Sequence, residues 1–338
     1  MTEGDNSFIT EEQSEHELSQ EKRGGLSIWP HLLIVGFILF LVFSTLIIPK
    51  ALSFLKMNDE PAKETPVILP RAEAVISLNL DDTKLRAEAV HVLDVNSGAT
   101  LYAKNANESL PLASITKLMT ALVAHELVED TAVIKVSRAA AKQESGGGLT
   151  WGEEFEAKEL SAFALVSSFN AAAFALAASV GTALGEADGA SQFVAAMNIT
   201  AAELNLPSLT FYNPTGLDVS TKEAGGYGTA SDVSALMKYL YVTYPEIIDP
   251  TTTPSLTLQN SAGAFHTSEN TNGSLSKIPN LLGSKTGYTD LAGGNLTIIF
   301  DAGFNRPVVV TVLGSTLMGR FADVETLVAA VQVALSQE

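Results

Sequence analysis

The chain has 338 residues, 46% of them hydrophobic, with 38 Asp and Glu against 20 Lys and Arg and a formal net charge of −18. No basic patch is visible, which argues against a nucleic-acid partner because phosphate binding needs clustered cations. The sequence has no cysteine, which excludes disulfides, thiolate zinc sites, iron–sulfur clusters and a cysteine nucleophile.

The N-terminal part of the chain predicts a tail followed by a membrane span. Residues 1–27 are polar and acidic, which is typical of a disordered segment. Ile28–Ile48 follows, 21 residues without Asp, Glu, Lys or Arg. As a helix it would measure about 31 Å, enough to cross the hydrocarbon layer of a bilayer. We therefore predict a transmembrane helix; a cleavable signal peptide fits less well, because the polar leader is long and no small-x-small site follows.

Residues 49–73 contain four prolines and balanced charges, which indicates a semi-rigid stalk. Residues 74–338 then form the remaining domain. Cations lie on both sides of the hydrophobic span, so the positive-inside rule does not fix its orientation. The orientation has to follow from the chemistry of the domain.

The domain begins and ends with strand-like runs and has helical patterns between them. Turn residues join the runs into two predicted hairpins; the runs are Ala89–Val95, Leu101–Lys104, Asn295–Phe300 and Pro307–Leu313. The predicted helices are Ser114–Glu129, Glu159–Val180, Gln192–Leu204, Ser231–Tyr241 and Phe321–Leu335. This order predicts an α+β fold in which the terminal strands share one antiparallel sheet, packed with a helical middle region.

A Ser-x-x-Lys motif, Ser114 to Lys117, opens the first predicted helix. Residues three apart lie on one face of a helix, and the helix dipole is positive near the serine. A partly desolvated lysine can lose its proton and act as a base for the serine. An N-cap serine followed by a surface lysine gives the same short pattern, so the motif alone is weak.

Two further motifs strengthen the interpretation of Ser114 and Lys117 as a nucleophile and its base. Ser168-Phe169-Asn170 lies 54 residues after Ser114, and Lys285-Thr286-Gly287 lies 117 residues after Ser168. Class A β-lactamases and penicillin-binding proteins carry these three elements in this order. The chain resembles the serine-type D-Ala-D-Ala carboxypeptidases, the low-molecular-mass penicillin-binding proteins, over nearly all of 74–338. The stretches that carry this resemblance are His91–Asn105, Leu110–Ala121, Phe193–Asn198, Phe211–Asp218 and Gly283–Gly293.

The resemblance implies a β-lactamase/DD-peptidase-like fold and acyl transfer without a metal or cofactor. Ser114 would attack the carbonyl between the two D-alanines of a peptidoglycan stem peptide, with Lys117 as its base. Ser168 would pass a proton to the leaving amine, and Asn170 would orient Lys117 and bind the substrate amide. β-Lactam antibiotics would act as covalent inhibitors.

The resemblance also implies a set of substrate-binding residues. Lys285 would supply positive charge, and Thr286 would bind the terminal carboxylate beside Gly287. The backbone N–H groups of Ser114 and Tyr288 would form the oxyanion hole. Arg320 would hold the carboxylate with its guanidinium group; a charge at the start of the last helix is the competing interpretation.

The middle motif departs from the common Ser-Gly-Asn-Asp pattern, because Phe169 and Ala171 replace the glycine and the aspartate. This leaves open a catalytically weak protein that only binds peptidoglycan. A serine β-lactamase is a second alternative, with Glu203 as a candidate deacylating residue. The choice between carboxypeptidase and endopeptidase also stays open.

Two other patterns do not support a further site. His125-Glu126-x-x-Glu129 lacks the second histidine of a zinc peptidase, and Ser145–Gly148 lacks the ending of a phosphate loop.

We predict a membrane-anchored serine carboxypeptidase with a cytoplasmic tail and an extracytoplasmic catalytic domain.

Overall fold

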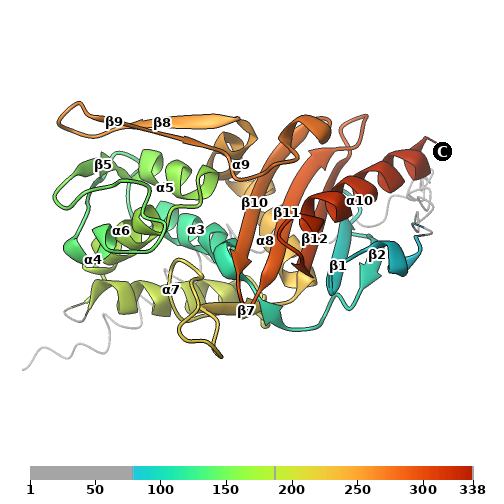
Figure 1. The fold of residues 1–338 in the computed structure, drawn as a ribbon, viewed down its shortest axis with the longest axis horizontal. Helices are drawn as coiled ribbons and strands as arrows, with labels where there is room; N and C mark the ends of the chain where they lie inside the picture. Colours follow the sequence, from blue (N-terminus) through green and yellow to red (C-terminus); the bar gives the residue numbers. More distant parts are fainter. Residues whose placement is uncertain (1–77, 79, 186–187, 337–338) are drawn as a thin grey trace, which may run out of the picture. The chain divides into compact units, whose positions relative to one another are not determined.

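A five-stranded antiparallel sheet lies beside a group of helices (Figure 1). Its strands, in spatial order, are β10 (Leu281–Thr289), β11 (Gly293–Asp301), β12 (Pro307–Ser315), β1 (Ala89–Asp94) and β2 (Thr100–Lys104). The computed structural model describes residues 78, 80–185 and 188–336. The predicted tail, membrane span and stalk (residues 1–27, 28–48 and 49–73) lie outside these residues. Across the described ranges, no helix has the length and hydrophobicity to span a bilayer.

The sheet joins the two ends of the domain. Strand β1 pairs antiparallel with β12, with Val92 opposite Val310. The predicted α+β fold with terminal strands in one antiparallel sheet is therefore confirmed.

Both faces of the sheet are covered by helices (Figure 1). Successive side chains of a strand point to opposite faces, and β12 supplies both cores: Val309 belongs to the larger core with α8 (Ala230–Thr243), and Val310 to the smaller core under α10 (Gly319–Leu335). Because both of its faces are buried, β12 (Pro307–Ser315) is almost continuously apolar.

The larger core is formed mainly by helices at the left of Figure 1. They are α3 (Lys117–Leu127), α4 (Arg138–Ala141), α5 (Ala157–Val166), α6 (Asn170–Gly181), α7 (Gly189–Glu203) and α9 (Pro245–Ile248). Four short 3₁₀ turns accompany them: η1 (Asp82–Lys84), η2 (Ala113–Thr116), η3 (Asp249–Thr252) and η4 (Leu275–Lys277).

Small strands complete the fold and were not predicted. They are β3 (Leu110–Pro111), β4 (Val133–Lys135), β5 (Glu154–Glu156), β6 (Thr210–Phe211), β7 (Gly226–Gly228), β8 (Ser255–Gln259) and β9 (Phe265–Glu269). Strands β8 and β9 form a hairpin that extends over α5 (Figure 1). Apart from β8 and β9, which have five residues each, these strands have two or three residues and are too short to show the alternation on which a sequence-based prediction depends.

The prediction of one helical stretch over Glu159–Val180 is wrong. Helix α5 ends at Val166, α6 begins at Asn170, and Ser168 between them has a left-handed φ of +62°. No glycine or proline marks this break. A contact with Lys285, 117 residues away, holds Ser168 in place, so tertiary structure overrides the local helical pattern.

Candidate active site

Lys117 lies at the centre of the site, as the first residue of α3, and is almost completely buried. Its Nζ lies 2.7 Å from Ser114 Oγ, in the 3₁₀ turn η2 that precedes the helix. It also contacts Asn170 Oδ1 at 2.7 Å and the backbone oxygen of Thr215 at 2.8 Å. The structure thus brings together Ser114, Lys117 and Asn170.

Burial favours the neutral form of this lysine. Desolvation lowers the pKa of Lys117 to about 7. A neutral amine has two N–H groups and one lone pair. Donation to Asn170 Oδ1 and Thr215 O would use both N–H groups and leave the lone pair for the hydroxyl of Ser114. Lys117 is therefore placed to accept the serine proton at neutral pH.

A turn at Asn213–Gly216 supplies the backbone acceptor for Lys117. Asn213 Oδ1 accepts hydrogen bonds from the backbone N–H groups of Thr215 and Gly216. Gly216 has a φ of +78°, and a Cβ there would lie 1.9 Å from Ala113 O, so only glycine fits this close approach. Sequence reasoning did not identify Thr215 as a site residue; the Asn-Pro-Thr-Gly turn composition was the available signal.

Ser168 approaches the site from the break between α5 and α6. Its Oγ accepts a hydrogen bond of 2.8 Å from Lys285 Nζ. Its φ of +62° is uncommon for a non-glycine residue and is characteristic of functional positions. The left-handed backbone places Ser168 beside Lys285 while Asn170, two residues later, contacts Lys117.

Lys285 and Thr286 reach the site from β10, and both are buried. Lys285 Nζ also donates to the backbone oxygen of Thr286 at 2.9 Å. The hydroxyls of Thr286 and Thr271 lie 2.6 Å apart. Thr271 is a neighbour that sequence reasoning missed, because it belongs to no motif.

Gly287 allows β10 to approach the nucleophile. A Cβ on Gly287 would lie 3.1 Å from Ser114 N and 2.8 Å from Leu112 O, closer than side-chain carbons normally pack. The next residue, Tyr288, has a half-exposed side chain. The expected oxyanion hole, formed by the backbone N–H groups of Ser114 and Tyr288, stays a prediction.

Arg320 is positioned by its contact with the Lys-Thr-Gly motif. It lies in the first turn of α10, is only 7% exposed, and donates from Nη1 to Gly287 O at 2.6 Å. Its guanidinium carbon also lies 4.8 Å from the centre of the Phe321 ring. Burial lowers its pKa to about 10, which leaves it protonated at neutral pH.

Lys117, Lys285 and Arg320 form a cluster of buried basic side chains. Burial, together with the charges of Lys117 and Arg320, lowers the pKa of Lys285 well below its usual value. Within residues 80–185 and 188–336, no ion pair joins any of the three to a carboxylate. An incoming anion would relieve this repulsion, so the site favours a ligand with a carboxylate.

Glu203 lies apart from this cluster. It is exposed at the end of α7. Burial and, after it, the charge of Glu203 raise the pKa of Glu126, which lies near the far end of α3 from Lys117. A deacylating carboxylate must activate water at the acyl-enzyme. The position of Glu203 does not support that role.

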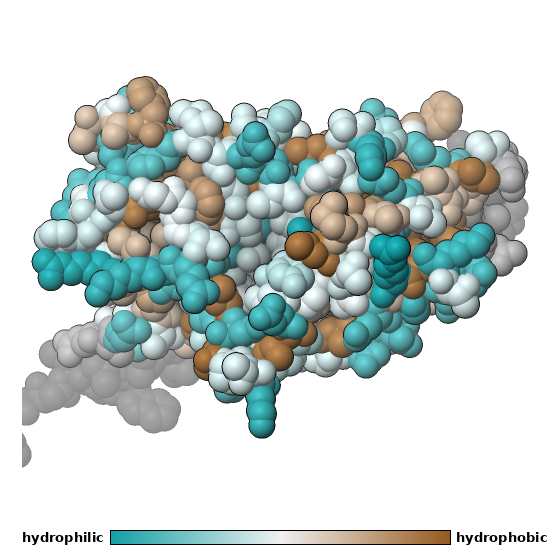
Figure 2. Space-filling view, viewed as in Figure 1, coloured by the Kyte–Doolittle hydropathy of each residue, from teal (hydrophilic) through white to brown (hydrophobic). Residues whose placement is uncertain are grey.

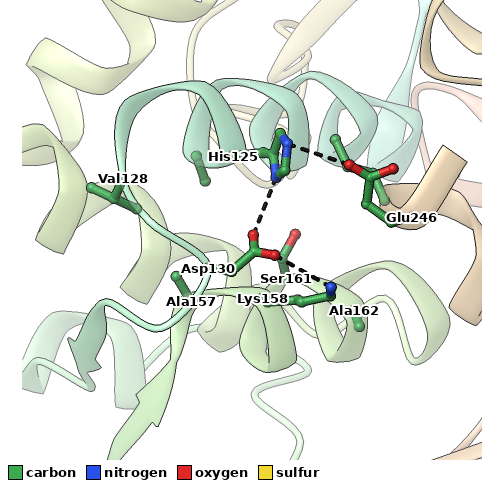
Figure 3. Close-up of a pocket in the computed structure, with 10 residues that line it drawn as sticks. His125, Val128, Asp130, Ala157, Lys158, Ser161, Ala162 and Glu246 are labelled. Atoms are coloured by element: carbon green, nitrogen blue, oxygen red, sulfur yellow. Dashed lines mark ion pairs between the residues drawn. The ribbon is translucent and has the colours of Figure 1, made fainter. Parts of the chain in front are cut away.

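His125 belongs to a separate pocket, also at the C-terminal end of α3 (Figure 3). Its Nδ1 lies 3.3 Å from Asp130, which also contacts Lys158, and its Nε2 lies 3.6 Å from Glu246. The histidine thus lies between two carboxylates that face different ring nitrogens. In the part of the chain that the structure describes, no group of three His, Asp or Glu residues could hold a metal ion.

The space-filling view of the face in Figure 2 shows mostly hydrophilic and intermediate side chains, with apolar residues in small groups. Among the apolar residues, Leu317 and Met318 are exposed just before Arg320. The candidate catalytic residues Ser114, Lys117, Ser168 and Asn170 are buried or half-buried.

Comparisons with known proteins agree on one family. Residues 76–316 match the family described as D-alanyl-D-alanine carboxypeptidase. The chain is 34% identical over 245 residues to the D-alanyl-D-alanine carboxypeptidase DacF of Bacillus subtilis, covering 70% of this chain and 60% of that protein. It is 30% identical over 218 residues to a D-alanyl-D-alanine endopeptidase of Pseudomonas aeruginosa, covering 62% of this chain and 66% of that protein. The chain therefore spans less than two thirds of the length of these relatives.

A solved structure shows the same fold. Penicillin-binding protein D2 of Listeria monocytogenes, in its ampicillin-bound form, superposes with a TM-score of 0.63 at 31% identity. The match covers 75% of this chain and 98% of that chain. The expected penicillin-binding protein fold, with mixed α+β content and antiparallel sheets, is thus confirmed.

Proposed function

The chain belongs to the D-alanyl-D-alanine carboxypeptidase family, and from this premise we propose that it is a serine D-Ala-D-Ala carboxypeptidase acting on peptidoglycan stem peptides. The contact of 2.7 Å between Lys117 Nζ and Ser114 Oγ carries the proposal. It pairs a hydroxyl nucleophile with a buried amine whose pKa is about 7, as nucleophilic catalysis at neutral pH requires.

The reaction has two steps. Ser114 Oγ attacks the carbonyl carbon between the two D-alanines and gives its proton to Lys117. The C–N bond breaks, Lys117 returns the proton by way of Ser168 to the leaving amine, and the terminal D-alanine departs. Water then attacks the Ser114 ester, which restores the hydroxyl and releases the shortened peptide.

The cluster of basic side chains supplies the substrate preference. A peptide that ends in D-alanine carries a free carboxylate, and Lys285, Thr286 and Arg320 are the groups that bind it. Ampicillin also carries a carboxylate next to its reactive carbonyl, and the related Listeria protein was solved with it bound. We therefore expect β-lactams to acylate Ser114.

The direct test incubates the full-length protein, in detergent, with a fluorescent penicillin and separately with diacetyl-Lys-D-Ala-D-Ala. Covalent labelling together with release of D-alanine supports the proposal. Rapid penicillin turnover without peptide cleavage would instead identify a β-lactamase. If wild-type protein is neither labelled nor cleaves the peptide, the protein only binds peptidoglycan.

The rate of acylation should depend on the protonation of Lys117. Its pKa is lowered to about 7, and only the neutral amine accepts a proton. We expect the penicillin acylation rate to rise with pH through a midpoint near 7 and then level off. Stopped-flow measurements from pH 5 to 9 test this; a rate that falls as pH rises through 7 would contradict it.

Replacing Arg320 with glutamine should weaken binding of the substrate carboxylate. Charge-assisted hydrogen bonds contribute about 1.5–3 kcal/mol, so KM for diacetyl-Lys-D-Ala-D-Ala should rise about 10- to 100-fold with little change in kcat. A peptide with an amidated C-terminus lacks the carboxylate. It therefore distinguishes loss of carboxylate binding from loss of the hydrogen bond between Arg320 and Gly287 O. Equal losses for both peptides would refute carboxylate binding, and Arg138→Gln on the surface is the control.

We also propose that Ile28–Ile48 anchors the protein in the cell membrane, with the N-terminal tail in the cytoplasm and residues 74–338 outside. Two considerations support this: the 21-residue uncharged run and the location of peptidoglycan outside the membrane. A reporter that works only outside the cytoplasm, fused after Glu338, should be active. Activity of a cytoplasmic reporter at the same position would refute this orientation.

A further inference from the structure

The glycine-rich segment Ser145–Gly148 lies directly against the Ser168–Ala171 segment. The backbone N–H of Asn170 donates to Ser145 O at 3.2 Å, and Asn170 Nδ2 donates to Glu144 O at 2.8 Å. The same asparagine presents Oδ1 to Lys117. The glycine-rich segment is therefore bound to a residue of the catalytic machinery.

These contacts fix which end of the Asn170 amide faces the lysine. An amide side chain has a donor end and an acceptor end. Because Glu144 O accepts from Nδ2, the acceptor Oδ1 is directed to Lys117. If the loop moved away, the amide would lose the contact that orients it.

The ring of Phe169 packs on this loop at Gly147. A Cβ on Gly147 would lie 2.0 Å from Phe169 Cδ2, a distance that no side chain can adopt. The ring also contacts Phe163 of α5, with ring centres 5.4 Å apart. Phe169 thus fills the space that a side chain at position 147 would need.

Both departures from the Ser-Gly-Asn-Asp pattern lie against the glycine-rich segment, Phe169 at Gly147 and Ala171 at Gly146. Phe169 stands where that pattern has glycine, and it lies over Gly147. Ala171 stands where the pattern has aspartate, and a Cβ on Gly146 would lie at an ordinary contact distance of 3.5 Å from Ala171 Cβ. Ala171 is fully buried, so its small size suits the close loop.

We propose that Phe169 is a positioning residue, matched to Gly147, which holds the loop at Glu144 and Ser145 in place and through it orients Asn170 toward Lys117. Its catalytic consequence rests on the proposed function. The packing of the ring on Gly147 supplies the apolar contact, and the two hydrogen bonds from Asn170 transmit the loop position to the amide.

The chain offers a matched pair of variants as a test. Gly147 and Gly148 have similar left-handed φ values, +71° and +76°, but nothing lies within 4 Å of a Cβ on Gly148. Alanine therefore adds the same backbone strain at both positions, and only Gly147→Ala meets the Phe169 ring. We expect Gly147→Ala to slow penicillin acylation at least 10-fold and Gly148→Ala to stay within about 2-fold of wild type.

A double-mutant cycle tests the matching. In a Phe169→Ala background the ring is gone, so Gly147→Ala should have little further effect on the acylation rate. Because Oδ1 stabilises the protonated amine, misorientation of Asn170 should also move the pH midpoint of acylation below that of wild type in both Phe169→Ala and Gly147→Ala. Additive effects, equal effects of the two glycine variants, or an unchanged midpoint would overturn the proposal.

Thermal unfolding separates this inference from the proposed function. It is measured for wild type, Gly147→Ala, Phe169→Ala and the double variant. If the changes in unfolding midpoint caused by the two substitutions are not additive, the Phe169 ring contacts the loop. This measurement does not depend on enzymatic activity. If wild-type protein is not acylated but the unfolding midpoints are coupled, the proposed function fails and Phe169 is a packing residue only. That outcome also overturns its role in positioning.

Discussion

Replacing Ser114 with alanine is expected to abolish covalent labelling by a fluorescent penicillin and to abolish release of D-alanine. The ester forms on Ser114 Oγ, and no other hydroxyl of the described site contacts Lys117 Nζ. Opening of the β-lactam ring loses no leaving group, so acylated wild-type protein gains the whole mass of the penicillin. Intact-mass spectrometry of both proteins measures this difference.

The second serine of the site is the matched control for this prediction. Ser168 Oγ contacts Lys285 rather than Lys117 and acts on the leaving group. Ser168→Ala should therefore label more slowly but still reach one penicillin per protein. Labelling of Ser114→Ala at the wild-type level would show that another residue is the nucleophile.

Replacing Lys117 with arginine is expected to slow acylation by about 10²- to 10⁴-fold, the usual contribution of a general base. An arginine keeps a positive charge and several N–H donors, but it does not lose its proton at neutral pH. The loss therefore reports the missing base rather than a missing charge. Single-turnover acylation measured between pH 6 and 9 should also lose the rise near pH 7.

A smaller side chain and a surface substitution complete this experiment. Lys117→Met removes both the charge and the base and should be at least as slow, while Lys135→Arg, at an exposed position, should match wild type. Circular dichroism checks that both Lys117 variants are folded. Wild-type rates in a folded Lys117→Arg would exclude this lysine as the base.

Much of the site could be predicted because most of its candidate residues belong to three short sequence motifs. Ser114, Lys117, Ser168, Asn170 and Lys285 were identified from the order and spacing of three elements. In the structure Lys117 contacts Ser114 and Asn170, and Lys285 contacts Ser168. The terminal sheet was also predictable, because its strands are long and bounded by turn residues.

Other features depended on contacts between distant segments. The break at Ser168 has no local signal in an Ala-rich helical pattern, and Thr215 contributes only its backbone oxygen. Strand β10 was missed because the buried Ser-Lys-Thr-Gly run lacks the alternation of a half-exposed strand.

The family and the α+β class could be predicted from the sequence, and Ser114 and Lys117 could be proposed as nucleophile and base, because these predictions depend on residue types at fixed spacings. Its composition, acidic and free of cysteine, is compatible with a serine site but did not locate one. The electrostatic properties of the site depend on the tertiary structure. Burial, which the sequence does not show, lowers the pKa of Lys117 to about 7. The fold also brings three basic side chains together within an acidic chain. The contact of Phe169 with Gly147 also depends on the tertiary structure, because it joins segments more than twenty residues apart.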